Sequence, residues 1–160
     1  ARGENLTNGD LVGTKDGSAY GLVFDPQDEN VFYFSNNDKH CIYKYDLRTK
    51  EWAWWAGQEG KSGYLDGPIG QAMFNKPGQM CVDSEGNIIL TDTENHCIRK
   101  ITMSTGYVST LAGKPQNSGY VNGSAEDAQF KKPLGICIDN DDVMYIGDSE
   151  NRAIRRLAVE

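Results

Sequence analysis

The sequence repeats itself along this chain, and this internal repeat constrains the fold more than any other feature. Shifting the sequence by 56 positions aligns it with itself without gaps from His40 to the end. The matched residues are Phe74 with Phe130, Pro77 with Pro133, Asp83 with Asp139, Asp92 with Asp148, and Asn95 with Asn151. A fixed period of this length indicates an architecture in which one supersecondary unit stacks on the next.

Each copy of the repeat is predicted to contain four short β-strands. In the second copy the segments GQMCVD, NIILTD, CIRKI and YVSTLAG are rich in β-branched and aliphatic residues, and the turns DSEGN, TENH and TMSTG separate them. No stretch shows a convincing helical period. Four-stranded sheets repeated around an axis are the blades of a β-propeller. We therefore predict an all-β fold, with one propeller segment at 1–160 and blades at about 17–57, 74–113 and 130–160.

The predicted segment is about half of a six-bladed ring, because a propeller needs at least four blades to close. The third copy is incomplete, since the sequence to Glu160 covers only its first three strands. Two ways of completing the ring stay open. Either the remainder of a longer chain supplies the missing blades, or two copies self-associate head to tail.

The segment FNKPGQMCVDSEGNIILTDTENHCIRKI resembles an NHL repeat, with its Pro-x-Gly start, its valine-Asp strand end and its Gly-Asn turn. The chain departs from the family pattern at Cys41, Cys97 and Ala153, where the family has arginine, and at Asn36 and Lys39 in the first copy. The long spacer AGKPQNSGYVNGSAEDAQFKKP is similar to that of bacterial surface and periplasmic proteins. The resemblance implies a β-propeller repeat protein in the cell envelope, either in the periplasm or on the cell surface.

Charge and hydropathy bear on the partners of the chain. The formal net charge is -7 and the isoelectric point is about 4.8, so the surface is expected to repel phosphate backbones. No segment approaches the roughly 20 apolar residues that a membrane helix requires. We therefore expect neither nucleic-acid binding nor membrane insertion.

The direction of the strands predicts which face of the propeller carries function. The turns SNNDKH, TDTENH and GDSENR share a face with the long connections between blades, whereas the opposite face has only short turns. Loops on a rigid scaffold commonly carry function. We predict a non-enzymatic scaffold whose long-loop face mediates interaction with protein, peptide or carbohydrate. The alternative is a propeller hydrolase or lyase with a metal in the central channel, whose other half lies outside this chain. No nucleophile and histidine base can be paired from the sequence, so enzymatic activity stays uncertain.

Aromatic and charged residues near the long connections are the candidate ligand contacts. They are Tyr64, Asp66, Tyr120, Lys61, Lys114 and Lys132 in or beside the connections, and Trp52 and Trp54 in the fourth strand of the first copy. The tyrosines recur at one repeat position, which also fits a role in loop packing. The tryptophans fit either packing between blades or an exposed platform for a sugar ring or peptide.

Polar residues of the turns are expected to be structural. Asp92, Asn95, Asp148 and Asn151 suit the capping of turn N–H groups, although the same carboxylates could hold calcium. We expect no other cofactor. The only histidines, His40 and His96, share one repeat position, which indicates a repeated structural role and not a zinc site.

The four cysteines also follow the repeat, because the same shift matches Cys41 with Cys97 and Cys81 with Cys137. Equivalent positions in adjacent blades are expected to lie too far apart for a disulfide. We predict four buried free thiols that behave as small hydrophobic residues.

Overall fold

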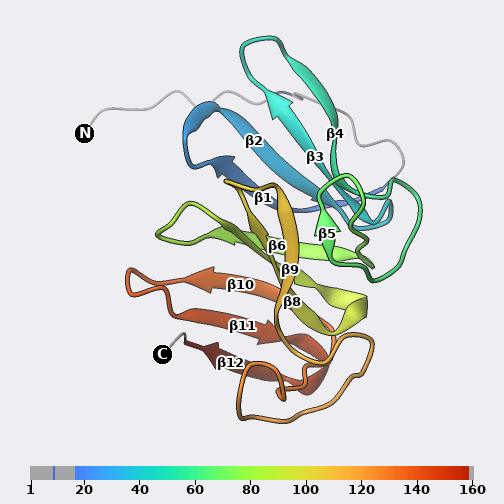
Figure 1. The fold of residues 1–160 in the computed structure, drawn as a ribbon, viewed down its shortest axis with the longest axis vertical. Helices are drawn as coiled ribbons and strands as arrows, with labels where there is room; N and C mark the ends of the chain where they lie inside the picture. The colour runs from blue at the N-terminus through green and yellow to red at the C-terminus, as the bar shows by residue number, and fades with distance from the viewer. Residues whose placement is uncertain (1–8, 10–16, 159–160) are drawn as a thin grey trace.

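The computed structural model describes residue 9 and residues 17–158, and its strands form three antiparallel sheets in succession along the chain (Figure 1). Blade 1 consists of β1 (Ala19–Asp25), β2 (Asp28–Asn36), β3 (Cys41–Asp46) and β4 (Glu51–Gly57). Blade 2 consists of β5 (Gly67–Pro68), β6 (Pro77–Val82), β7 (Ile88–Asp92), β8 (Cys97–Thr102) and β9 (Tyr107–Ala112). Blade 3 consists of β10 (Pro133–Ile138), β11 (Met144–Asp148) and β12 (Ala153–Leu157).

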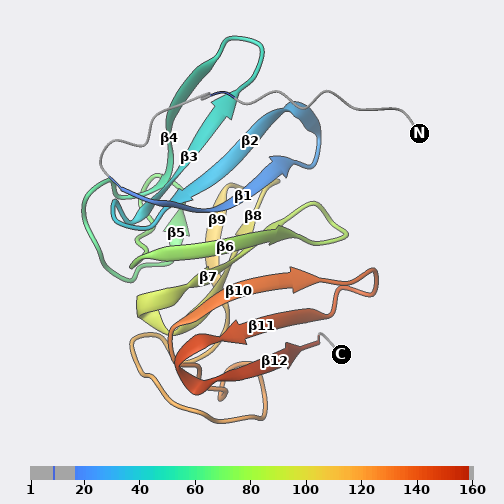
Figure 2. The same cartoon turned by 180° about the vertical axis from the view of Figure 1, so that it is seen from behind.

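Consecutive strands within each blade are neighbours, except for β5, which lies beside β9 at the outer edge of blade 2. Two short 3-10 turns follow the same pattern: η1 (Thr93–Asn95) joins β7 to β8, and η2 (Ser149–Asn151) joins β11 to β12. Strands β1, β6 and β10, which are the first strands of the three repeat copies, lie side by side, as the view from behind shows (Figure 2). The predicted all-β fold of propeller blades is confirmed. Neither 3-10 turn of the described chain has the length or apolar content to cross a membrane.

One strand was not predicted. The connection from blade 1 to blade 2 contributes β5, which pairs antiparallel with the outer edge of β9 through Gly67 opposite Val108. The connection therefore crosses the outside of blade 2 before it enters β6. It also forms a small hairpin, in which Leu65 pairs with Met73.

The hydrophobic core consists of layers between successive blades. Leu90 and Ile101 of blade 2 pack in the same hydrophobic layer as Tyr33 and Ile42 of blade 1. Ile98, on the other face of blade 2, packs in a second layer with residues of blade 3. Because side chains alternate between the faces of a strand, strands that are apolar on both faces require a neighbour on each side.

Polar contacts also join the blades at repeated positions. The Ser35 hydroxyl donates to the Gly78 carbonyl at 2.6 Å. The imidazole Nδ1 of His40 accepts the N–H of Lys76 at 3.0 Å, and the Nδ1 of His96 accepts the equivalent N–H of the next blade at 3.0 Å. The predicted structural role of the histidines is confirmed, and it consists of connecting each blade to the following one.

The prediction of four buried thiols is wrong for one cysteine. All four are free, and Cys41, Cys81 and Cys97 are buried, but Cys137 is exposed. Cys81 lies in the layer between blades 2 and 3. The corresponding face of blade 3 has no neighbouring blade in the described part of the chain, so Cys137 remains open to solvent.

Candidate binding site on the long-loop face

The long connections, residues 58–76 and 113–132, lie against the 3-10 turns, as the strand directions predict. The N–H of Gln116 donates to the Asn95 carbonyl at 2.8 Å, and the N–H of Glu94 donates to the Asn75 carbonyl at 3.0 Å. These contacts place turns and connections on one face of the molecule. We refer to it as the long-loop face.

A buried arginine fixes the first connection to blade 2. Arg99 of β8 is fully buried, and its Nη1 donates to Asp92 at 2.7 Å and to the Met73 carbonyl at 2.9 Å. Its Nη2 donates to the Leu65 carbonyl and to Asp66, both at 2.9 Å. Charge-assisted hydrogen bonds of this kind are stronger than neutral ones. One side chain therefore holds both strands of the small hairpin.

Aromatic rings enclose the same guanidinium. Its central carbon lies 4.7 Å from the ring centroid of Tyr64 and 5.1 Å from that of Phe74. Such stacking is favourable for a planar cation. The Tyr64 hydroxyl hydrogen-bonds the Thr110 hydroxyl, which in turn donates to Asp66 at 3.1 Å. The arginine cluster of blade 2 (Tyr64, Asp66, Phe74, Asp92 and Arg99) thus also contacts β9.

Blade 3 has an equivalent cluster at the next copy of the repeat, centred on Arg155. Arg155 donates to Asp148 at 2.8 Å and, through Nη2, to Asn122 at 2.7 Å. The rings of Tyr120 and Phe130 lie 4.8 Å and 4.7 Å from its guanidinium carbon. Sequence reasoning missed both arginines. The signal that would have found them is the constant spacing from the turn aspartate to the arginine in both copies.

The polar turn residues are located where these connections join the blades. Asp92 accepts the N–H of Asn75 at 2.8 Å. Asn95 donates from its amide to Asp92 at 2.8 Å and to the Gly63 carbonyl at 2.9 Å. Asp148 and Asn151 make the corresponding contacts, with 2.7 Å between the two side chains. These side chains therefore hold the preceding connection, whereas the prediction had them capping their own turns.

A groove of about 840 Å³ lies between the end of β9 and the second connection. Its polar lining residues are Tyr64, Thr110, Lys114, Asn117, Glu126 and Asp127, and apolar ones include Leu111 and Ala125. Of the predicted ligand contacts, the structure brings Tyr64 and Lys114 together in this groove. Asp66 does not line the groove, but it accepts hydrogen bonds from Arg99 and from Thr110, which does line it.

The other predicted lysines and Tyr120 lie outside this groove. Lys61 is exposed on the first connection. Lys132 pairs with Glu94 at 3.5 Å and with Glu150 at 3.1 Å. Tyr120 is 58% exposed and lines a different groove beside β12.

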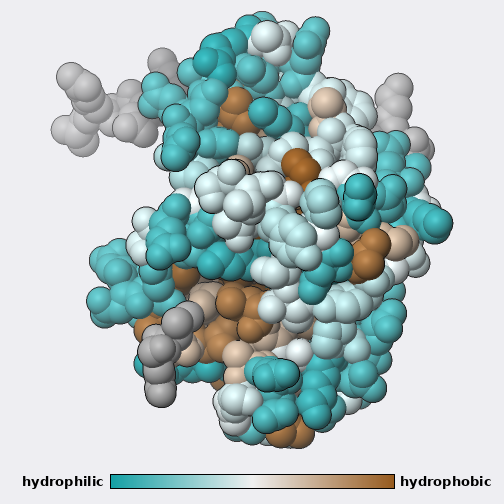
Figure 3. All heavy atoms as spheres, in the orientation of Figure 1, coloured by the Kyte–Doolittle hydropathy of each residue, from teal (hydrophilic) through white to brown (hydrophobic). Residues whose placement is uncertain are grey.

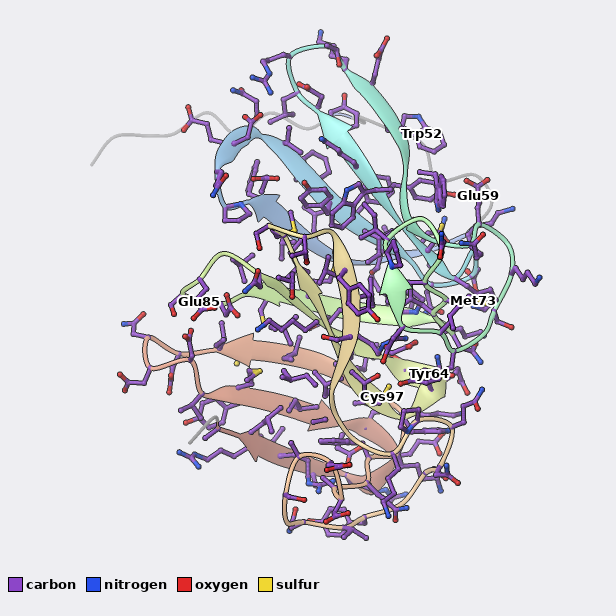
Figure 4. The ribbon with its side chains drawn as sticks, viewed as in Figure 1. Trp52, Glu59, Tyr64, Met73, Glu85 and Cys97 are labelled. Carbon is purple, nitrogen blue, oxygen red and sulfur yellow. The ribbon has the colours of Figure 1, made fainter. Side chains whose placement is uncertain are left out.

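The tryptophans of β4 belong to blade 1, and Trp52 lies away from Tyr64 (Figure 4). Trp52 is 49% exposed and contacts the ring of Tyr43 edge-on at 5.0 Å. Trp54 is 43% exposed, and its Nε1 donates to the Gly57 carbonyl at 2.9 Å. Both present aromatic surface to solvent, but neither lines the groove. Within residues 17–158, no cluster of three or more histidine, cysteine, aspartate or glutamate side chains could hold a metal ion.

Blades that share one sequence repeat, stacked with their first strands side by side, define the chain as part of a β-propeller. The sequence model of the NHL repeat matches residues 74–101. The chain is 30% identical over 152 residues to NHL repeat-containing protein 2 of Gallus gallus, covering 94% of this chain and 19% of that protein. The chain is an NHL-repeat protein.

Solved structures from Bacteroides share this fold. A protein of unknown function from Bacteroides thetaiotaomicron is 33% identical, with a TM-score of 0.83 over 92% of this chain and 36% of that one. An auxiliary nutrient binding protein from Bacteroides ovatus is 29% identical, with a TM-score of 0.79 over 94% of this chain and 40% of that one. The chain thus spans well under half the length of these relatives.

Proposed function

We propose that this chain is a non-enzymatic binding module and that the 840 Å³ groove on its long-loop face takes a short peptide or oligosaccharide. The groove itself is the observation that carries this proposal. Its volume is in the range of small-molecule sites, about 300–1,000 Å³. Its lining is a mixture of apolar walls and hydrogen-bonding groups, which suits a polar ligand with some apolar surface.

The walls of the groove are held in place before any ligand binds. Tyr64 is fixed by its hydroxyl bond to Thr110 and by Arg99, which is itself fully buried. On the second connection, the N–H of Gly113 donates to the Ala125 carbonyl at 2.9 Å, which closes the base of the loop. Walls that are already ordered reduce the entropy lost on binding.

Charges of both signs line the groove, because Lys114 accompanies Glu126 and Asp127. This arrangement favours a ligand that offers both donors and acceptors, such as a peptide backbone or sugar hydroxyls. The likeness to a nutrient binding protein of Bacteroides ovatus supports a nutrient as the ligand class and the cell envelope as the location.

Isothermal titration against a panel of di- to tetrapeptides and oligosaccharides tests the proposal. We expect saturable binding by members of one class, weakened at least tenfold in Lys114→Ala and in Asp127→Ala. Glu85→Ala is the matched control, because Glu85 is an exposed charge in the short turn between β6 and β7, on the opposite face. Binding that is lost equally in the control, or that is indifferent to both groove variants, would contradict the proposal.

A further inference from the structure

The 840 Å³ groove has a counterpart one repeat earlier, where β4 of blade 1 meets the first connection. Four residues that line the groove can be compared directly with the first copy. The 56-residue shift matches Thr110, Gly113, Lys114 and Glu126 with Trp54, Gly57, Gln58 and Gly70. The glycine that ends the fourth strand is therefore common to both copies, whereas the other three residues differ.

The backbone around these residues follows the same course in both copies. Trp54 pairs with Tyr43 of β3, and Thr110 pairs with Arg99 of β8, in the same register and next to the same bulge. The N–H of the closing glycine donates to a carbonyl of the connection, from Gly57 at 3.1 Å in the first copy and from the equivalent glycine at 2.9 Å in the second. The two places therefore differ mainly in their side chains.

In the first copy an indole ring fills this place. The Nε1 of Trp54 donates to the Gly57 carbonyl at 2.9 Å. The far edge of the ring lies beside the connection, because a Cβ at Gly70 would be 3.9 Å from the indole Cη2. The Gln58 amide joins the same two walls, since its Nε2 donates to the Gly70 carbonyl at 2.8 Å. The indole thus spans the gap between the end of β4 and the first connection.

The second copy has a threonine in place of this tryptophan. Thr110 is much shorter, and its hydroxyl is used on Tyr64 and Asp66. The gap between the end of β9 and the second connection stays open as the 840 Å³ groove. The groove is therefore the place of an indole that this copy of the repeat does not supply.

We propose that the groove accepts the indole ring of a tryptophan residue in a peptide ligand. This inference rests on the proposed function and narrows its ligand from peptides and oligosaccharides to tryptophan-containing peptides. The bound indole takes the place that Trp54 has in blade 1, and its N–H donates to the Gly113 carbonyl. Because Trp54 is itself 43% exposed, the bound ring keeps one side open to solvent, and the peptide main chain leaves the groove there.

The lining of the groove suits an aromatic ring that carries a polar N–H. Leu111 and Ala125 offer apolar contact, and Tyr64 offers the ring of its side chain. Figure 3 shows hydrophobic surface gathered over the strands of blade 3, whereas the surface over β9 is mostly intermediate to hydrophilic. Indole combines a large apolar area with a hydrogen-bond donor, so it matches this mixed lining better than an aliphatic side chain does. Lys114 and Asp127 then meet carbonyl and N–H groups of the peptide main chain.

Isothermal titration of the full chain with three capped tripeptides tests the inference. The probe is acetyl-Gly-Trp-Gly-amide, and its two analogues carry leucine or 1-methyltryptophan in the central place. We expect saturable binding of the tryptophan peptide and at least tenfold weaker binding of the leucine peptide, which has neither ring nor donor. The 1-methyl ring is still planar but cannot donate, so we expect it to bind at least fivefold more weakly. Slowed amide hydrogen exchange over residues 110–117 and 125–127 should locate the bound peptide.

Thr110→Trp places an indole of the chain itself in the groove, as in blade 1, and should abolish binding of the tryptophan peptide. Tyr107→Trp is the matched control, because it adds an indole at an exposed position of the same strand that does not line the groove. The control should leave binding unchanged. Circular dichroism checks the fold of both variants, and the comparison of the three peptides decides the question on the unmodified chain whether or not Thr110→Trp folds.

Equal affinity for the tryptophan peptide and either analogue, undiminished binding by Thr110→Trp, or protection outside the groove would overturn the inference. If another peptide or an oligosaccharide binds in a manner that depends on Lys114, and the tryptophan peptide does not bind, the inference fails while the proposed function stands. If no peptide or oligosaccharide binds at all, both fail.

Discussion

Replacing Arg99 by methionine tests whether the arginine cluster holds the first connection in place. Methionine preserves the length and apolar stem of the side chain but removes every hydrogen bond of the guanidinium. Asp92, which is completely buried, would keep its bonds from Asn95 and Asn75 but would lose its counter-charge. Breaking a buried ion pair by removing one partner costs roughly 3–5 kcal/mol. We expect the free energy of unfolding to fall by about that amount.

Urea unfolding followed by far-ultraviolet circular dichroism measures this loss directly. For a chain of this size, the same loss lowers the melting temperature by roughly 6–20 °C. Arg155→Met is the matched comparison, because its cluster makes the same contact with Asp148 but borders the open groove beside β12. Solvent can reach that cluster, so we expect the cost to be smaller there.

The double variant Arg99→Met with Asp92→Asn separates a charge effect from a packing effect. If the loss arises from an uncompensated carboxylate, neutralising Asp92 should recover part of it. A loss in Arg99→Met below about 1 kcal/mol, well under the usual cost of a broken buried pair, or no recovery in the double variant, would refute the argument that this ion pair holds the connection.

Two further predictions concern the histidines and the exposed thiol. Burial lowers the pKa of His40 and His96, whose Nδ1 atoms accept backbone N–H groups of the next blade. As the pH falls, the unfolded chain therefore binds protons at these histidines before the folded chain does. The contribution of the two histidines to the free energy of unfolding is fully present above about pH 6.5 and should be lost as the pH falls below it. Urea midpoints between pH 7.5 and 5.5 should show this slope, and the variant with both histidines changed to glutamine should lack it. For the thiols, a native-state titration with a disulfide reagent should modify Cys137 alone, because burial raises the pKa of Cys81 to about 12; rapid reaction of more than one thiol in the folded protein would contradict this.

The repeat predicted strand order and the long-loop face because both depend on local patterns that recur in each copy. The strand β5 could not be predicted, since Gly67 and Pro68 are residue types depleted in strands, and their pairing with β9 depends on the tertiary position of the connection, which Arg99 contacts at Leu65. The burial of Cys137 was predicted wrongly because burial depends on a neighbouring blade and not on the repeat position alone. The 840 Å³ groove was not predictable, because its shape depends on how the second connection lies beside the end of β9 and Tyr64.

Blade 1 shows what the arginine clusters add to the scaffold. At the repeat position of Arg99 it has Tyr43, and at that of Asp92 it has Asn36. There the ion pair is replaced by aromatic packing, with Tyr43 lying 5.3 Å from the ring of Phe34 and 5.0 Å from that of Trp52.

Aromatic packing of this kind can stabilise a sheet as well as a buried ion pair does, since well-packed apolar groups often replace such pairs without loss. Within the described residues, however, Tyr43 donates no hydrogen bond to a carbonyl of a long connection, whereas the arginines of blades 2 and 3 donate to carbonyl oxygens of the connections. The distinctive contribution of the arginines is therefore to order the long connections. Both connections that border the proposed groove are ordered in this way, one by each arginine. The two buried arginines therefore give the long-loop face the ordered connections that the proposed ligand binding would use.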